Sequence, residues 1–301
     1  MTRSPEERAD ELFNLAQAKS EEGDELAALV LYLESLALDR EQPSALYNIG
    51  LIYKYRREWK DSLRYNQLAA ELRPDDDATN WNLGIAATAL REWRIARAAW
   101  RRARIKVEEG DAPILDGFGF NPVRLNGFEG GDGNPEVVWA TRLSPVTARI
   151  ENIPTPEARF RFGDIVLHDG AETGTRLYAP GDERSVFNVF ELFEPSAFIT
   201  FDVHLDAPDS AAIEELEVAC KAAGIEIEDW TKNLRNFCKA CSEGRAHEQH
   251  DHSLKSDEWQ IERRIGLASK DAAAIDALLD RWVAAGKERR IESVESANDA
   301  S

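Results

Sequence analysis

The sequence LYNIGLIY, residues 46–53, decides the fold of the N-terminal third of the chain because it recurs at a fixed spacing. LFNLAQAK begins at Leu12 and NWNLGIAA begins at Asn80, so each copy lies 34 residues from the next. Gly50 and Gly84 occupy the same position of this period, and Ala16 occupies it one period earlier. A small residue at a fixed place in a 34-residue period indicates pairs of helices that approach closely and stack. We therefore predict three helix–turn–helix units within residues 1–110.

Two further sets of small residues keep the same register: Ala28, Ser62 and Ala96, and then Ser35, Ala69 and Ala103. Together with Pro74, which closes the second unit, they make residues 9–110 resemble the tetratricopeptide repeat (TPR) family. The resemblance implies a superhelix whose concave face, lined by the first helix of each pair, grips an extended peptide. The sequence departs from the family pattern at Lys19, Asn66 and Ala87, where large apolar or aromatic residues are usual. We therefore expect the first and last repeats to be looser or to act as caps.

Asparagine recurs at one position of the period, as Asn14, Asn48 and Asn82, two residues before the small residue. Side-chain amides both donate and accept hydrogen bonds, so a row of them can bind a peptide backbone without reading its sequence. This row resembles the asparagine ladder of some peptide-binding TPR proteins, and it makes a protein or peptide the expected partner. The alternative interpretation is ordinary polarity of a helix surface.

Net charge and composition argue against nucleic acid and membranes as partners. Residues 1–110 hold 20 acidic and 17 basic residues, whereas the remaining residues hold 36 and 20, which gives a net charge of −19. So acidic a C-terminal portion repels phosphate backbones, and we expect no nucleic-acid partner. Residues 91–106 are locally basic, which is typical of a solvated helix face, of a face that docks on the acidic half, or of a site for an acidic partner. No apolar run is long enough to span a membrane, and three cysteines are too few for a disulfide framework, so we expect no membrane partner and a cytoplasmic location.

The middle of the chain changes character twice. Residues 111–135 are rich in glycine and proline and are predicted to be a linker. Residues 136–196 alternate apolar and polar residues and are predicted to form a small β-rich, barrel-like segment. His168 lies in the short sequence LHDG, where we expect a surface turn.

The last third, residues 197–301, contains a duplication. DSAAIEELEVACKAAG, residues 209–224, aligns without gaps with DAAAIDALLDRWVAAG, residues 271–286. Each copy has an aspartate that can cap the start of a helix and a glycine that can end it, and each lies between two strand-like runs. This βαβ pattern, present twice, resembles a ferredoxin-like sandwich with four antiparallel strands and two helices on one face. The predicted fold is thus α in the N-terminal part and α+β in the C-terminal part, and the fold alone implies no function.

A cysteine–histidine cluster lies in the insert 231–258, between the two halves of this duplication. FCKACSEGRAHEQHDH, residues 237–252, contains five candidate metal ligands: Cys238, Cys241, His247, His250 and His252. Zinc favours four ligands of mixed sulfur and imidazole, and a metal can stabilise a polar segment that has little apolar surface. We predict a structural zinc site formed by Cys238, Cys241, His247 and either His250 or His252. A reduced cysteine pair in a polar loop is the alternative.

Two functions follow from these patterns. The first is a protein–protein interaction adaptor or scaffold that binds an extended peptide in its TPR groove, with zinc stapling a C-terminal loop. The second is a zinc-dependent hydrolase or other metalloenzyme, in which Glu248 beside the histidines serves as the general base. The repeats and the asparagine row favour the adaptor.

Overall fold

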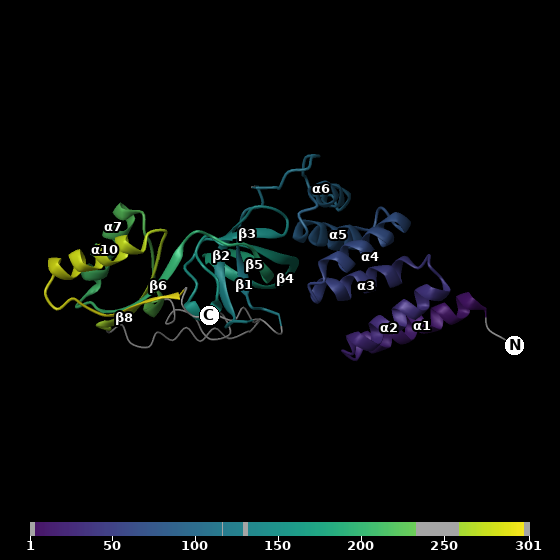
Figure 1. The fold of residues 1–301 in the computed structure, drawn as a ribbon, viewed down its shortest axis with the longest axis horizontal. Coiled ribbons are helices and arrows are strands. Elements are labelled where there is room, and N and C mark those ends of the chain that lie inside the picture. The colour runs from purple at the N-terminus through teal and green to yellow at the C-terminus, as the bar shows by residue number, and fades with distance from the viewer. Residues whose placement is uncertain (1–3, 116, 129–131, 233–258, 298–301) are drawn as a thin grey trace. The chain divides into compact units, whose positions relative to one another are not determined.

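The computed structural model describes residues 4–115, 117–128, 132–232 and 259–297. The chain divides into two compact units, Met1–Leu115 and Asp116–Ser301, and each is described by itself. The first unit is helical and the second contains the strands (Figure 1). No helix within the described ranges is long and apolar enough to cross a membrane.

The helices of the first unit form three consecutive pairs. They are α1 (Pro5–Glu21) and α2 (Glu25–Leu38), α3 (Pro43–Tyr55) and α4 (Trp59–Leu72), and α5 (Asp77–Ala89) and α6 (Trp93–Arg102). Each helix packs against the next along the chain, and α3 also contacts α5. The N-terminal unit is therefore a helical repeat, as the 34-residue period predicts.

Local sequence signals explain where these helices begin and turn. A capping box joins Ser4 to Glu7 at the start of α1, and the carboxylate of Asp24 accepts a hydrogen bond from the Ala27 backbone at the start of α2. The turn within each pair contains one residue with positive φ at the same place in the period: Gly23, Arg57 and Arg91. A left-handed residue reverses the chain direction within a short turn, so the repeat preserves its turn geometry even where glycine is lost.

Small residues at the repeat positions allow the two helices of a pair to approach. A side chain at Gly50 would collide with Asn66 of α4, and one at Gly84 would collide with the ring of Trp100 of α6. Asn66 is fully buried where a large apolar residue was expected, and its amide donates to the backbone carbonyl of Ser62 at 2.8 Å. The departure at Asn66 is thus accommodated by a hydrogen bond inside the repeat.

The second unit begins with a closed five-stranded barrel. Its strands are β1 (Phe120–Leu125), β2 (Glu136–Arg142), β3 (Thr147–Ile150), β4 (Ile165–Ala179) and β5 (Asp182–Glu194). Neighbouring strands are antiparallel, and β1 closes the barrel by pairing in parallel with β5. Inward-facing Val123, Leu125, Val138, Ile150 and Val166 fill the interior.

The structure corrects two predictions in this region. Strand β1 lies inside the segment 111–135 that was predicted to be a linker, because Pro122 and the surrounding glycines hide its short alternation. His168 was predicted to lie in a surface turn, but it lies within β4 and is fully buried. The register of β4 against β5 shifts between His168 and Glu172, so the Asp–Gly pair forms an irregularity inside a strand rather than a turn.

A four-stranded sheet with two helices follows the barrel. The elements are β6 (Ile199–Asp206), α7 (Ser210–Ala223), β7 (Glu226–Asp229), β8 (Glu262–Ser269), α10 (Ala272–Ala285) and β9 (Arg290–Ser296). The strand order is β7-β8-β6-β9, and every neighbouring pair is antiparallel. Asp209 and Asp271 cap the two helices as predicted, whereas Gly224 ends α7 in the left-handed conformation and Gly286 follows α10 in an extended one.

The hydrophobic core of this part lies on one face of the sheet, and the alternation of side chains along each strand identifies that face. Phe201, Val203 and Leu205 of β6 and Ile265 and Leu267 of β8 pack with the helices. Alternate residues of a strand point to opposite faces, so Gly266 and Ala268 lie on the face that carries no helices. There Ala268 packs with Ile153 of the barrel, so the barrel contacts the helix-free face.

Candidate functional site

The asparagine row lies on the first helix of each pair. Gly50 faces α4, and Asn48 precedes it by two residues, which corresponds to about 200° around a helix, so Asn48 lies on the side away from α4. The same argument places Asn82 on the side of α5 away from α6. Asn14 is exposed, Asn48 is half-buried and Asn82 is buried. Because α3 and α5 contact each other, Asn48 and Asn82 occupy equivalent positions on adjacent helices.

Asn48 is held by a tyrosine that the sequence did not single out as functional. Its amide nitrogen donates to the hydroxyl of Tyr32 on α2 at 3.0 Å. Burial raises the pKa of Tyr32, so the hydroxyl stays protonated at neutral pH. The bond uses one of the two N–H donors of Asn48 and fixes the orientation of its carbonyl oxygen. One period later the equivalent of Tyr32 is Asn66, so this pairing is not repeated between Asn66 and Asn82.

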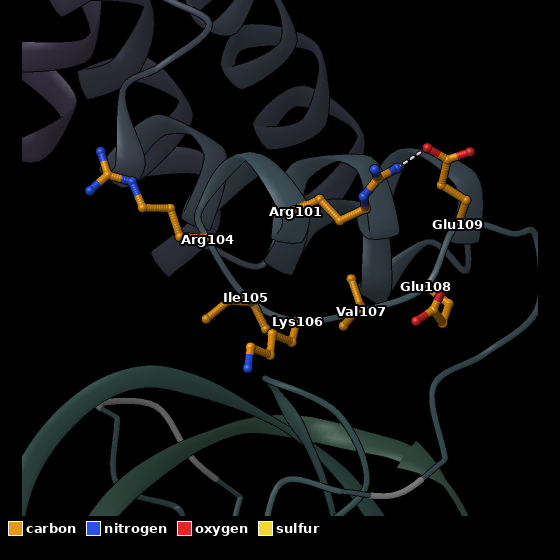
Figure 2. Close-up of a pocket in the computed structure, with 7 residues that line it drawn as sticks. All are labelled: Arg101, Arg104, Ile105, Lys106, Val107, Glu108 and Glu109. Carbon is orange, nitrogen blue, oxygen red and sulfur yellow. Dashed lines mark hydrogen bonds and ion pairs between the residues drawn. The ribbon is translucent and has the colours of Figure 1, made fainter.

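The basic segment 91–106 ends in a groove of about 670 Å³ (Figure 2). Its lining combines three cationic, two acidic and two apolar side chains: Arg101, Arg104, Lys106, Glu108, Glu109, Ile105 and Val107. In the same segment, the guanidinium of Arg97 donates to the carbonyls of Ala112, Glu108 and Pro113 at 2.7, 2.8 and 3.0 Å. Arg101 pairs with Glu109, and Arg104 lies 3.7 Å from Asp77. Part of the basic segment therefore folds the chain that follows α6 back onto the helix.

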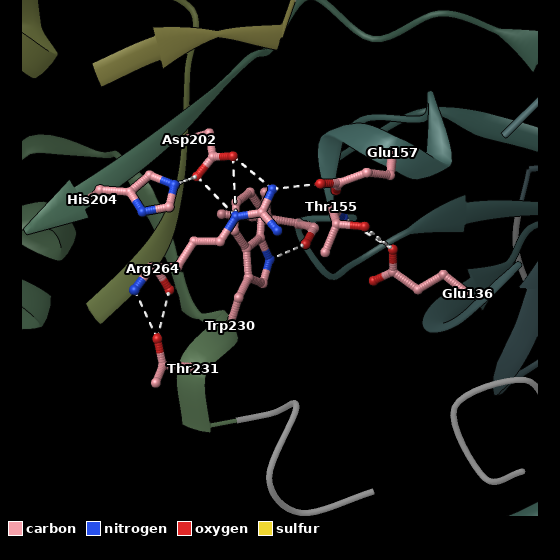
Figure 3. A network of polar contacts seen from close by, with 9 residues as sticks. Glu136, Thr155, Glu157, Asp202, His204, Trp230, Thr231 and Arg264 are labelled. Atoms are coloured by element: carbon pink, nitrogen blue, oxygen red, sulfur yellow. Dashed lines mark hydrogen bonds and ion pairs between the residues drawn. The ribbon is translucent and has the colours of Figure 1, made fainter. Parts of the chain in front are cut away.

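A polar network joins the barrel to the helix-free face of the sheet (Figure 3). The guanidinium of Arg264 on β8 donates to Asp202 of β6 at 2.6 Å and to Glu157 of the barrel at 2.8 Å. These two carboxylates raise the pKa of Arg264 above its ordinary value. The guanidinium of Arg264 also lies 5.1 Å from the centre of the Trp230 ring, and the indole of Trp230 donates to the carbonyl of Ile153 at 2.9 Å. Charge pairing and a buried aromatic ring thus hold the two parts of the second unit together.

A half-buried carboxyl extends this network into the barrel. Glu136 accepts hydrogen bonds from the backbone nitrogen and the hydroxyl of Thr155 at 3.0 and 2.8 Å. Burial, with smaller contributions from Glu228 and Glu157, raises the pKa of Glu136 to about 7 despite the bonds from Thr155. No sequence pattern marks Glu136, because its environment is assembled from residues distant along the chain.

The described residues on either side of residues 233–258, the main part of the insert 231–258, are anchored to the sheet. Before it, the hydroxyl of Thr231 accepts from the backbone nitrogen of Arg264 at 2.7 Å. After it, the indole of Trp259 donates to the carbonyl of Ala207 at 2.8 Å, and the guanidinium of Arg263 lies 4.5 Å from its ring. Arg263 also forms a buried ion pair with Asp229. The residues at the two ends of the insert are therefore attached to the sheet, one to β8 and the other to the residue that follows β6.

All five predicted zinc ligands, Cys238, Cys241, His247, His250 and His252, lie outside the described residues, as does Glu248. Among the residues that are described, no group of three or more His, Cys, Asp or Glu side chains is arranged to hold a metal. Cys220 is described, and it is a buried core residue of α7.

No family model matches the chain. No curated protein matches it. Among solved structures, the TPR domain of Sgt2 from Aspergillus fumigatus matches with 20% sequence identity and a TM-score of 0.29. The match covers 32% of this chain and 63% of that one, so it spans less than two thirds of the Sgt2 domain.

Proposed function

We propose that this chain is a protein-interaction module whose TPR-type helical repeat binds an extended segment of another protein. The observation that carries the proposal is the row of Asn14, Asn48 and Asn82 at one repeat position, with Asn48 oriented by Tyr32. An amide whose rotamer is already fixed loses less conformational entropy when it binds. Such a side chain suits the capture of a peptide backbone.

The proposed recognition is largely independent of peptide sequence. An extended backbone presents alternating N–H and C=O groups, and the amides of the exposed Asn14 and the half-buried Asn48 can donate to the one and accept from the other. Specificity would then come from neighbouring side chains of the groove rather than from the asparagines.

The second part of the proposal is a structural zinc ion in the insert, bound by Cys238, Cys241, His247 and either His250 or His252. The anchoring of Thr231 and Trp259 supports it, because a loop whose two ends are fixed needs less energy to close around a metal. The sheet order β7-β8-β6-β9 with two helices on one face likewise supports the ferredoxin-like assignment of residues 197–301. We assign this part no catalysis and propose a cytoplasmic location for the whole chain.

The groove is tested with a library of random peptides displayed on phage and selected against the full chain. The triple variant Asn14→Ala/Asn48→Ala/Asn82→Ala is expected to lose binding of the selected peptides. Lys60→Ala/Arg64→Ala/Gln67→Ala on α4 serves as the matched control, because these residues lie outside the asparagine row. Equal binding by the triple asparagine variant and the wild type would contradict the groove mechanism.

A further inference from the structure

The outer face of α2 differs from the same face in the other two repeats. At three positions of the period the first repeat has Leu26, Val30 and Leu33. One period later, on α4, the equivalents are Lys60, Arg64 and Gln67, and on α6 they are Arg94, Ala98 and Arg101. The first repeat therefore carries an apolar surface at the positions where the other two repeats carry a mostly basic one.

Two of the three apolar side chains of this face are exposed. Leu26 is 65% and Val30 is 54% exposed, whereas Leu33 is partly buried. Both Leu26 and Val30 lie two residues from the buried Ala28, which faces α1, so both point away from α1. Residues at i, i+4 and i+7 are neighbours on one helix face, and together they form a continuous apolar stripe.

The charges on α2 have one sign. Glu25 and Glu34 are exposed on the helix, Asp24 caps it, and α2 contains no lysine or arginine. The stripe is thus apolar with acidic flanks, whereas the equivalent faces of α4 and α6 are basic.

From these observations we propose that the outer face of α2 docks an amphipathic helix of another protein, whose apolar stripe is flanked by lysine and arginine. A helix fits better than an extended strand because the backbone groups within α2 are already bonded inside the helix and offer no edge. Basic flanks fit because they complement Glu25 and Glu34. This surface is separate from the asparagine row, so two partners or two parts of one partner can bind at once.

A second copy of the chain fits this face less well. Pairing of α2 with α2 of another copy brings glutamates of like charge to both sides of the apolar contact, and like charges at helix contacts are destabilising. Self-association through this stripe is therefore the competing outcome that the experiment must exclude.

The probe is a fluorescein-labelled synthetic peptide with leucine at the heptad contact positions and lysine at the flanking positions. Its binding to the full chain is followed by fluorescence anisotropy. We expect saturable binding, which weakens at least about tenfold in Leu26→Lys/Val30→Arg because buried leucine and valine contacts are lost. A peptide with glutamate in place of the flanking lysines is expected to bind at least about tenfold more weakly than the lysine peptide.

The repeat itself supplies the control. Leu26→Lys/Val30→Arg places on α2 the residues that α4 carries at Lys60 and Arg64, so the fold should tolerate it, as an unchanged thermal midpoint would show. Lys60→Ala/Arg64→Ala is expected to bind the peptide like the wild type. Equal binding by Leu26→Lys/Val30→Arg and the wild type, or no saturable binding by the wild type, overturns the proposal. It is also overturned if sedimentation shows a wild-type dimer that Leu26→Lys/Val30→Arg abolishes.

Discussion

Arg264 of the sheet and Glu157 of the barrel form an ion pair at 2.8 Å, and the same guanidinium binds Asp202. One side chain thus links the closed barrel of the second unit to its four-stranded sheet. The ion pair acts together with the bond from Trp230 to Ile153 and with the packing of Ala268 against Ile153.

Removing the ion pairs of Arg264 should weaken the attachment of the barrel to the sheet and lower the free energy of unfolding. Arg264→Ala leaves Asp202 without its charged donor, and we expect a loss of about 2–3 kcal/mol in the free energy of unfolding, since hydrogen bonds to charged groups contribute about that much. Urea unfolding followed by tryptophan fluorescence measures this loss. Glu157→Gln removes only the barrel side of the link and should cost less. A variant at Arg264 as stable as the wild type would show that the network does not hold the barrel to the sheet.

Glu136 should make stability depend on pH near neutrality. Its folded pKa of about 7 lies above its ordinary value of 4.5, so the folded state binds this proton more tightly than the unfolded chain does. The stabilisation from this proton is fully present below about pH 4.5 and is lost as pH rises through 7. The loss is at most about 3.5 kcal/mol, since each unit of pKa shift corresponds to about 1.4 kcal/mol.

Glu136→Gln keeps the shape of the side chain and removes its charge. We expect this variant to match the wild type at pH 5 and to be more stable at pH 8, as measured by thermal unfolding at both values. Glu151→Gln, which removes a carboxylate from an ion pair with Arg149, is the control for the loss of one negative charge. If Glu136→Gln follows the wild-type curve at both pH values, the carboxyl does not titrate near neutrality.

Features built from residues close together in the chain can be predicted from the sequence. Features built from residues far apart in the chain are missed. The helical repeat is local and periodic, so positions such as Gly50 and Gly84 reveal it directly. Strand β1 was missed because Pro122 and the surrounding glycines hide its alternation, and because its pairing with β5 joins residues more than sixty positions apart, as in Val123 with Phe187. His168 was misplaced for a related reason, since a bulge and a turn share the same Asp–Gly signal until the partner strand is known.

The site shows the same division. The positions of Asn14, Asn48 and Asn82 follow from the period, but the bond between Asn48 and Tyr32 depends on how one repeat packs on the next. The link through Arg264 unites three segments of the chain and has no signature in any one of them.

Tyr32→Phe tests whether a fixed amide matters for peptide binding. It removes only the hydroxyl that accepts from Asn48, so we expect a stability loss of about 1 kcal/mol and a weaker affinity for peptides selected by the groove. Isothermal titration with one selected peptide measures the affinity. Tyr65→Phe on α4 removes a hydroxyl one residue before Asn66 and serves as the control. An affinity that falls equally in both variants would show that Tyr32 acts only through general stability.

Zinc content decides the role of the insert. We expect one zinc ion per chain in the purified wild type and none in Cys238→Ser/Cys241→Ser, measured by elemental analysis. Glu248→Gln should keep the metal, because a structural site does not need this carboxylate.

Thiol titration adds an independent reading, since Cys220 is buried and its burial raises the pKa of the thiol to about 12. With zinc bound, all three thiols should resist the reagent. A chelator should expose Cys238 and Cys241, and only unfolding should expose Cys220. Two reactive thiols in the untreated protein, together with no metal, would remove the zinc staple from the proposal and leave the helical repeat unaffected.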